Sequence, residues 1–391
     1  MAEAANDLTI AVIAGEPSGD RLGGALMQAI KARAPRVRFV GVGGAEMAAQ
    51  GLKSVFPIDE LAIIGLVAIF QRLPSIFAHI RAAADAVIAA RPDALVIIDS
   101  PEFTHRVARR VRKALPHLPI IDYVCPSVWA WRPWRARAMR AYVDHVLALL
   151  PFEPDAMTRL GGPSTTFVGH PLAAEVTRLR PGADDAARRA ADPPLVLVLP
   201  GSRGEEIKRH LPMFGETTAR LAATAGAIEP VLPTPPHLAA RVKEAVEAWP
   251  VRPRVVTTED EKWAAFRQAR AALAASGTVT LELALASVPT VVAYRIPLFE
   301  EAIARLLIKV PTIVLANLVL GENVMPELIQ RHATPEKLVA ALAPLVTNTP
   351  ERLRQLVAFA RLDEAMAIGK AQPSETAANV VLELAASRIG P

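Results

Sequence analysis

Polar side chains that can hold a sugar or move a proton gather near the start of the chain. The segment Ala14–Asp20 reads AGEPSGD and directly follows an apolar run. Its glycines permit a tight turn and a close ligand approach, and Glu16, Ser18 and Asp20 can hydrogen-bond sugar hydroxyls. Capping of the next helix by Ser18 or Asp20 is the structural alternative. Because GxxxxGK[ST] is absent, the segment does not predict an NTP-hydrolysing P-loop.

A single carboxylate, Asp99, ends the apolar run Ala94–Ile98. At the carboxyl end of a parallel strand, such a side chain points into the ligand crevice. A general base for a sugar hydroxyl needs that placement. Helix capping is the alternative, although Ser100 can do that instead. We therefore predict Asp99 as the catalytic base, with Glu16 as the next candidate.

Two glycine turns in the second half of the chain can bind anions. The first, LPGSRGEEI, spans Leu199–Ile207, and the second, ASGTVTLE, spans Ala275–Glu282. Backbone N–H groups at a helix start bind phosphate, and an arginine adds bidentate contacts. A carboxylate one turn into the helix can reach ribose hydroxyls. Together the turns predict a nucleoside diphosphate site made by Ser202, Arg203, Ser276, Gly277, Thr278 and Glu282.

The segment Pro126–Trp134, PSVWAWRPW, contains three of the five tryptophans. It can form a flat wall for a sugar or an acyl chain, with Arg132, Arg135 and Arg137 facing phosphate or lipid. Packing of large aromatic side chains between domains is an equally good interpretation.

An apolar stripe at helical spacing runs through residues 66–80, beside Arg72, His79 and Arg81. A segment of this kind can lie in a bilayer interface, although core packing is the commoner meaning of such a stripe. We predict membrane or acyl-chain contact for Leu66, Ile69, Phe70, Leu73 and Phe77; Ile76 and Ile80 belong to the same stripe.

The elements that must position these residues alternate between apolar β-rich runs and helical patterns, which predicts α/β domains with doubly wound parallel sheets. A stretch without strand signal, Arg178–Pro194, separates two such series, and helices dominate from Pro297 onward. We expect the GT-B architecture of sugar transferases: two Rossmann-like domains facing across a cleft, with a helical C-terminal tail. The expected domains are residues 1–175, completed by a helix at about 367–391, and residues 190–366. The expected strands are 8–14, 37–40, 94–98, 120–124, 145–149, 165–168, 195–199, 230–232, 254–256, 271–274 and 290–294.

Composition narrows the classes of protein. The 391 residues suit about two domains. The longest apolar run, Leu61–Phe70, is about half of what a membrane span needs, and the polar start resembles no secretory signal. Cys125 is the only cysteine, so no intrachain disulfide is expected. A net charge of +5 suits phosphorylated substrates or anionic lipid, whereas only 5% aromatic residues argue against nucleic-acid binding.

Taken together, the motifs resemble the lipid-A-disaccharide synthases, glycosyltransferase family 19. The resemblance covers the chain from about Thr9 to about Ala385. The matching motifs are AGEPSGD at 14–20, PSVWAW at 126–131, LPFE at 150–153, VGHP at 168–171, LPGSRGEEI at 199–207, SGTVTLE at 276–282, VVAYR at 291–295 and LANLVLGENVMPELIQ at 315–330.

The resemblance implies a UDP-2,3-diacylglucosamine donor and 2,3-diacylglucosamine 1-phosphate (lipid X) as acceptor. The products are a β-1,6-linked disaccharide 1-phosphate and UDP, by inversion and without a required metal or other cofactor. Asp99 matches the essential aspartate, Arg203 the diphosphate-contacting arginine and Asn317 a substrate-binding asparagine. Residues 63–80 match a membrane-facing element, which implies a cytoplasmic enzyme at the inner face of the inner membrane. Known members also form dimers that exchange C-terminal segments.

Three alternatives remain at the sequence level. Another GT-B enzyme, such as a UDP-N-acetylglucosamine 2-epimerase or a peptidoglycan-type transferase, would not be expected to need the apolar stretch Leu61–Ile80. An NAD-dependent oxidoreductase needs an intact GxGxxG, which Gly41–Gly44 does not supply. A non-catalytic membrane-associated binding protein would release no UDP.

Overall fold

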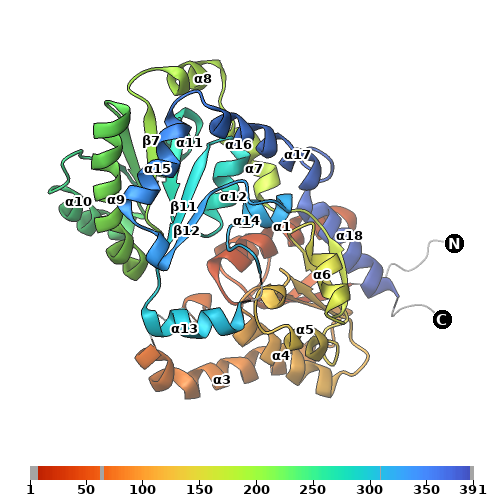
Figure 1. The fold of residues 1–391 in the computed structure, drawn as a ribbon. Helices are drawn as coiled ribbons and strands as arrows, with labels where there is room; N and C mark the ends of the chain where they lie inside the picture. Colours follow the sequence, from red (N-terminus) through yellow and green to blue (C-terminus); the bar gives the residue numbers. More distant parts are fainter. Residues whose placement is uncertain (1–7, 62–65, 309, 388–391) are drawn as a thin grey trace. The chain divides into compact units, whose positions relative to one another are not determined.

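The computed structural model describes residues 8–61, 66–308 and 310–387, without the side chains of residues 66–73 and 303. The chain forms two compact units, one made by Met1–Pro171 with Lys370–Pro391 and the other by Leu172–Gly369. Each unit is built around one six-stranded sheet (Figure 1). Within both sheets the paired strands run parallel.

The sheet of the first unit has the strand order β2-β1-β3-β4-β5-β6. Its strands are β1 (Thr9–Ala14), β2 (Arg38–Val42), β3 (Ala94–Ile98), β4 (Ile120–Tyr123), β5 (His145–Ala148) and β6 (Ser164–Phe167). Its α-helices are α1 (Pro17–Arg33), α2 (Ala45–Ala49), α3 (Leu66–Ala90), α4 (Pro101–Ala114), α5 (Trp134–Met139), α6 (Glu153–Arg159) and α18 (Pro373–Ala386).

Strand β1 shows why the strands of the first unit are continuous apolar runs and do not alternate between apolar and polar residues. Ile10 and Val12 pack into a cluster with α1 and α18, whereas Ala11 and Ile13 pack into a second cluster with α3 and α4. Because successive side chains point to opposite faces, both faces of this sheet are covered by helices. The C-terminal helix α18 thus belongs to the core of the first unit.

The sheet of the second unit has the order β12-β11-β10-β7-β8-β9. Its strands are β7 (Leu195–Leu199), β8 (Glu229–Pro233), β9 (Arg254–Val256), β10 (Ala271–Ala274), β11 (Thr290–Tyr294) and β12 (Glu327–Ile329). Its α-helices are α7 (Leu172–Leu179), α8 (Ala183–Ala190), α9 (Gly204–Ala225), α10 (Ala239–Val246), α11 (Glu259–Gln268), α12 (Val279–Leu285), α13 (Leu298–Leu307), α14 (Leu315–Leu320), α15 (Pro335–Val346), α16 (Pro350–Ala360) and α17 (Leu362–Ala365).

The expected α/β class with two doubly wound parallel sheets is confirmed. One short edge strand, β12, lies in the stretch that was expected to be helical. Its residues Glu327–Ile329 are too few to produce a strand pattern, and they pair with β11 only after the chain has passed through α13 and α14. The helical character of the C-terminal part is otherwise as expected.

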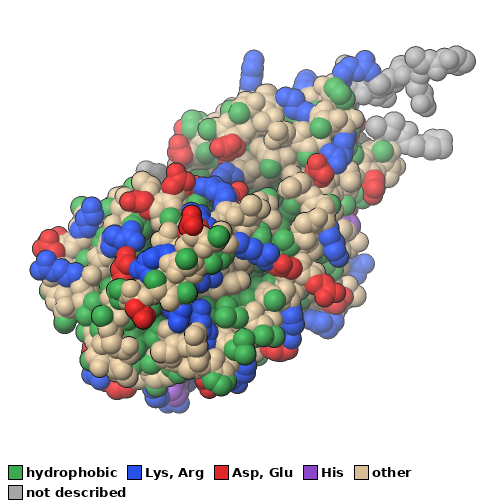
Figure 2. All heavy atoms as spheres, turned by 90° about the horizontal axis from the view of Figure 1, so that it is seen from above, with side chains coloured by type: hydrophobic (Ala, Val, Ile, Leu, Met, Phe, Trp, Pro, Cys, Tyr) green, Lys and Arg blue, Asp and Glu red, His purple; other side chains and the backbone are tan. Residues whose placement is uncertain are grey.

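On the face shown in Figure 2, basic, acidic and apolar side chains are interspersed, and no large patch carries a single charge. Among the described residues, no helix is both long enough and apolar enough to cross a membrane.

Candidate functional site

The first unit has a cavity of about 210 Å³ at the carboxyl ends of β3 and β4, which is where parallel sheets bind ligands. Asp99 lines it, as do His105, Asp122 and two residues of the tryptophan-rich segment and its helix, Trp131 and Arg135. The predicted base and part of that segment therefore share one cavity.

Asp99 is held from two sides. The Ser18 hydroxyl donates to Asp99 Oδ2 over 3.1 Å, and the Ser100 backbone N–H donates to Asp99 Oδ1 over 2.7 Å. Both Asp99 and Ser100 adopt left-handed backbone conformations, with φ of 54° and 46°. Gly15 leaves room for this turn, because a Cβ at that position would lie 2.5 Å from the Ser100 Cβ. The AGEPSGD segment therefore positions the carboxylate that follows β3.

The three polar residues of that segment have different surroundings. Ser18 reaches Asp99, and Glu16 is exposed at the start of α1. Asp20 is buried, and its carboxylate accepts the backbone N–H groups of Gly44, Glu46 and Met47 at 2.7–3.1 Å. Asp20 therefore caps α2, the helix after β2, rather than the helix that contains it.

A buried chain of hydrogen bonds, absent from the residues predicted for the site, adjoins the Asp99 cavity. His105 Nε2 lies 3.0 Å from Asp122 Oδ2, and His105 Nδ1 lies 3.1 Å from the Tyr142 hydroxyl. Arg109 donates to the same hydroxyl over 3.3 Å. Burial raises the pKa of Asp122; His105 lowers it and Asp99 raises it further, both by smaller amounts. The available signal in the sequence was an acidic residue, Asp122, inside the otherwise apolar run 120–124.

The three tryptophans of the PSVWAWRPW segment differ in their surroundings, and only one of them lies where a ligand could be contacted. Trp129 packs against the core and donates to Glu153 Oε1 over 3.1 Å. Trp131 lines the cavity and is 38% exposed, with the Arg132 guanidinium 4.3 Å from its ring centroid. Trp134 is exposed. Trp131 alone is therefore placed to contact a ligand in this cavity.

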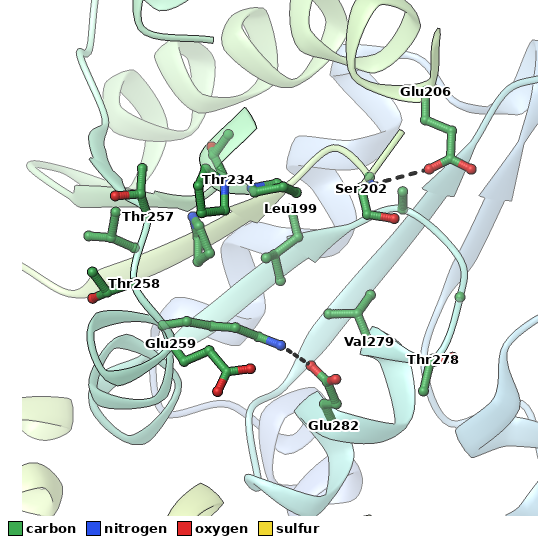
Figure 3. Close-up of a pocket in the computed structure, with 18 of the residues that line it drawn as sticks. Leu199, Ser202, Glu206, Thr234, Thr257, Thr258, Glu259, Thr278, Val279 and Glu282 are labelled. Carbon is green, nitrogen blue, oxygen red and sulfur yellow. Dashed lines mark hydrogen bonds and ion pairs between the residues drawn. The ribbon is translucent and has the colours of Figure 1, made fainter. Parts of the chain in front are cut away.

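The second unit has a pocket of about 380 Å³ at the carboxyl ends of β7, β8, β9 and β10 (Figure 3). The predicted residues Ser202, Ser276, Gly277, Thr278 and Glu282 all line it. The turns that carry them require glycine, since Gly201 and Gly277 have φ of 126° and 154°. Hydroxyl-bearing residues that the sequence did not single out complete the lining; these are Thr234, Thr257 and Thr258.

A carboxylate occupies the first anion-binding turn. Glu206 Oε2 accepts the backbone N–H of Ser202 over 3.3 Å (Figure 3), and Glu206 Oε1 pairs with the Arg203 guanidinium at 3.3 Å. The Arg203 side chain is 83% exposed and is not among the residues that line the pocket. The turn thus already binds an anionic side chain, and the largely exposed Arg203 pairs with that same carboxylate.

Glu282 and Lys262 form an ion pair inside the pocket, with 2.8 Å between Glu282 Oε2 and Lys262 Nζ (Figure 3). Lys262 lies on α11, the helix that follows β9. The pair keeps one carboxylate oxygen oriented and places a cation in the same pocket as the glycine turns. Lys262 was missed because its helix carries no glycine turn.

Two predicted binding residues are engaged within the protein. The Ser276 hydroxyl donates to the Ile313 carbonyl over 2.8 Å. Asn317 is buried; its amide donates to Asn323 and to the Met325 carbonyl and accepts the N–H groups of Val324 and Met325, all at 2.9–3.0 Å. Asn317 therefore organises the loop before β12 and is not among the residues that line the two cavities.

The predicted membrane stripe lies on α3. The side chains of Leu66, Ile69, Phe70 and Leu73 are outside the described residues. Phe77 is 56% exposed, with the Arg106 guanidinium 5.9 Å from its ring centroid. Ile80 is buried in the core, and Ile76 packs against it. The described part of the stripe thus contains both a core face and an exposed aromatic side chain.

The sequence was compared with protein-family models and with known proteins, and both comparisons indicate one family. The family model for lipid-A-disaccharide synthetase matches residues 10–381. Lipid-A-disaccharide synthase of Nitrobacter hamburgensis is 58% identical over 383 residues, covering 98% of this chain and 97% of the relative.

Solved structures with much lower identity share the fold. MurG of Acinetobacter baumannii matches with a TM-score of 0.56 at 15% identity, covering 96% of this chain and 99% of its own. UDP-GlcNAc 2-epimerase of Methanocaldococcus jannaschii, in complex with UDP-GlcNAc and UDP, matches with 0.58 at 12%, covering 96% and 100%. The fold is thus of the GT-B type, and the chain belongs to the lipid-A-disaccharide synthase family of glycosyltransferases.

Proposed function

We propose that this enzyme transfers the diacylated glucosamine of UDP-2,3-diacylglucosamine to the 6-hydroxyl of 2,3-diacylglucosamine 1-phosphate. The first unit, Met1–Pro171 with Lys370–Pro391, takes the acceptor and the second unit takes the donor. The acceptor oxygen forms a bond to the donor anomeric carbon while the bond from that carbon to the diphosphate oxygen breaks, which inverts the configuration.

Asp99 carries the proposal for proton transfer. It is the carboxylate at the carboxyl end of β3, it lines a cavity, and it is oriented by Ser18 and by its own following N–H group. It takes the proton of the attacking hydroxyl, a role that requires hydrogen-bond reach and a fixed orientation. Glu16, exposed on the same segment that supplies Ser18, is the next candidate.

The leaving UDP needs positive or dipolar partners. The N–H groups of Gly201–Arg203 lie at the start of α9, and this turn already accommodates the Glu206 carboxylate. When the diphosphate takes that place, Arg203 turns toward it from Glu206 and neutralises developing charge. Glu282, oriented by Lys262, binds the ribose hydroxyls. The UDP bound to the epimerase structural neighbour supports a UDP-sugar site in this fold.

We further propose that the N-terminal part of α3 lies on the inner face of the cytoplasmic membrane, because both substrates carry acyl chains. Phe77, exposed in the described part of this helix, belongs to the same stripe as Leu66, Ile69, Phe70 and Leu73. An apolar side chain that leaves water for lipid contributes about 1.5–3 kcal/mol.

Incubation of the purified protein with both lipids tests the proposal. Mass spectrometry is expected to detect a tetraacyl disaccharide monophosphate and free UDP, and neither when one lipid is omitted. Formation of an epimerised UDP-sugar instead of a disaccharide would contradict the proposed reaction.

A further inference from the structure

The second unit has another cavity, distinct from the nucleotide pocket in its lining. It measures about 550 Å³, which is within the size range of small-molecule sites. Helix α13 and the segment after it form one side, and β12 with the segment after β11 forms the other. Its carbon-rich lining includes Ile296, Ala304, Ile308, Val310, Pro311 and Ile313.

The polar groups of this cavity satisfy one another. Glu301 accepts from Gln330 Nε2 over 2.7 Å and from Arg305 over 2.5 Å. Glu327 accepts the Thr312 hydroxyl over 2.5 Å and the Ile313 N–H over 3.2 Å. Because polar groups that already have partners gain little from a polar ligand, the cavity favours a hydrocarbon occupant.

The cavity adjoins the nucleotide pocket at one residue. Ser276 lines both, and its hydroxyl donates to the Ile313 carbonyl in the wall of the second cavity. A ligand whose diphosphate rests on the glycine turns therefore has its far end beside this apolar space. Helix α13 also presents large apolar side chains to solvent: Leu298, Phe299 and Leu306 are 83%, 67% and 72% exposed.

We propose that this cavity takes an acyl chain of the UDP-linked donor, with the exposed face of α13 beside the bilayer from which the chain is drawn. The inference rests on the proposed function, which supplies a nucleotide sugar with acyl chains. It assigns the second unit a lipid-binding role in addition to the nucleotide site.

Binding of donor analogues to the full chain tests this without the transfer reaction. Calorimetry compares UDP, UDP-N-acetylglucosamine and UDP-2,3-diacylglucosamines whose chains differ in length. Each added methylene that enters the cavity is expected to tighten binding roughly fourfold, from the transfer free energy of a methylene group. The Ala304→Phe variant fills the cavity and is expected to lose this length dependence while it binds UDP as the wild type does.

A second variant, Ile308→Gln, places a polar group in the same wall and is expected to weaken binding of the diacyl donor but not of UDP. Leu353→Gln on α16 is the matched control, since Leu353 is 61% exposed and lies outside the cavity lining. It is expected to change neither.

The outcomes separate the two proposals. If wild type binds no UDP, the donor site itself is wrong. If wild type binds UDP but chain length has no effect, or Ala304→Phe and Ile308→Gln keep the wild-type length dependence, the acyl subsite is wrong.

Discussion

Asp99 shows how a catalytic carboxylate is fixed at the scale of one residue. Two successive non-glycine residues in left-handed conformations, Asp99 and Ser100, each cost on the order of 1–3 kcal/mol. The Thr104 hydroxyl offsets part of this cost, because it donates to the carbonyls of both residues at 2.7 and 3.1 Å. The strained turn directs the Asp99 carboxylate into the cavity instead of along the helix that follows.

Replacing Asp99 with Asn keeps the shape of the side chain and removes the base. Turnover is expected to fall by about 10²–10⁴-fold, the usual contribution of general base catalysis, whereas UDP affinity stays unchanged. Asp85→Asn on α3 is the control, since Asp85 is half-exposed and pairs only with Arg110 among the described contacts. Wild-type turnover in Asp99→Asn would move the role of base to Glu16.

Arg203→Ala is expected to weaken UDP binding at least tenfold, because a hydrogen bond to a charged group contributes about 1.5–3 kcal/mol. Turnover falls with it, since the same contact stabilises the leaving group. Arg220→Ala on α9, the helix that follows Arg203, is the control; Arg220 pairs with Glu216 and Glu336 at the surface. Equal UDP affinity in both variants would show that Arg203 does not contact the diphosphate.

Glu153 is expected to make stability depend on pH. Burial raises its pKa from 4.5 to about 7, although N–H donors including those of Leu150 and Trp129 pull it back. A carboxyl with a raised pKa binds protons more tightly in the folded state, so the free energy of unfolding rises as pH falls from about 7 to 4.5, and the penalty from ionising Glu153 is largest above about pH 7. The change amounts to roughly 3 kcal/mol at about 1.4 kcal/mol per pKa unit.

Urea unfolding of the wild type and of Glu153→Gln between pH 5 and 8 isolates this effect. Desolvation lowers the pKa of His170 to about 4. This acts in the opposite direction in both proteins, so the difference between the two curves is the informative quantity. The wild type is expected to gain stability relative to Glu153→Gln as pH falls from 8 to 5, because the Glu153 carboxyl takes up its proton in the folded state. A constant difference would mean that Glu153 stays ionised in the folded protein.

At the scale of the element, α3 offers a direct contrast between lipid contact and core packing. Phe77 is exposed, and Ile80, three residues later, is 6% exposed. Phe77→Ser is expected to reduce co-sedimentation with anionic vesicles without changing the melting temperature. Ile80→Ser is expected to destabilise the protein by about 2–5 kcal/mol, as large-to-small core changes do. If Phe77→Ser destabilises as strongly, the exposed face of α3 is structural.

The strands could be predicted from sequence where they are buried on both faces, as Leu195–Leu199 is, because such strands are continuous apolar runs. The edge strand β12 has no such run, and its pairing with β11 depends on tertiary structure. The two faces of α3 could not be told apart either. Ile76, Phe77 and Ile80 are equally apolar, and only the position of the neighbouring sheet decides which are buried.

The same distinction applies to the site. Motifs in which glycine permits a turn, such as the segments around Gly201 and Gly277, could be located because the backbone requirement is written in the residue type. The partners of Asp20 lie 24–27 residues away, so its capping of α2 could not be read from spacing. His105 and Asp122 were missed because a helix residue and a strand residue meet only in the folded sheet.

For the whole molecule, the fold and the reaction are identified by different observations. Enzymes as different as MurG and UDP-GlcNAc 2-epimerase share the architecture at 15% and 12% identity, so the fold alone does not select the reaction. The 58% identity to lipid-A-disaccharide synthase over nearly the whole chain does. The two cavities at strand ends then supply a chemical account, with a carboxylate in one unit and anion-binding turns in the other.

A time course that counts both products tests this account most directly. The purified protein is mixed with UDP-2,3-diacylglucosamine and 2,3-diacylglucosamine 1-phosphate, and UDP and disaccharide are quantified in the same samples. The account predicts equal amounts of the two products at every time, a β-linkage in the disaccharide, and no UDP when the acceptor is left out. UDP released without acceptor, or consumption of the donor without formation of a disaccharide, would contradict it.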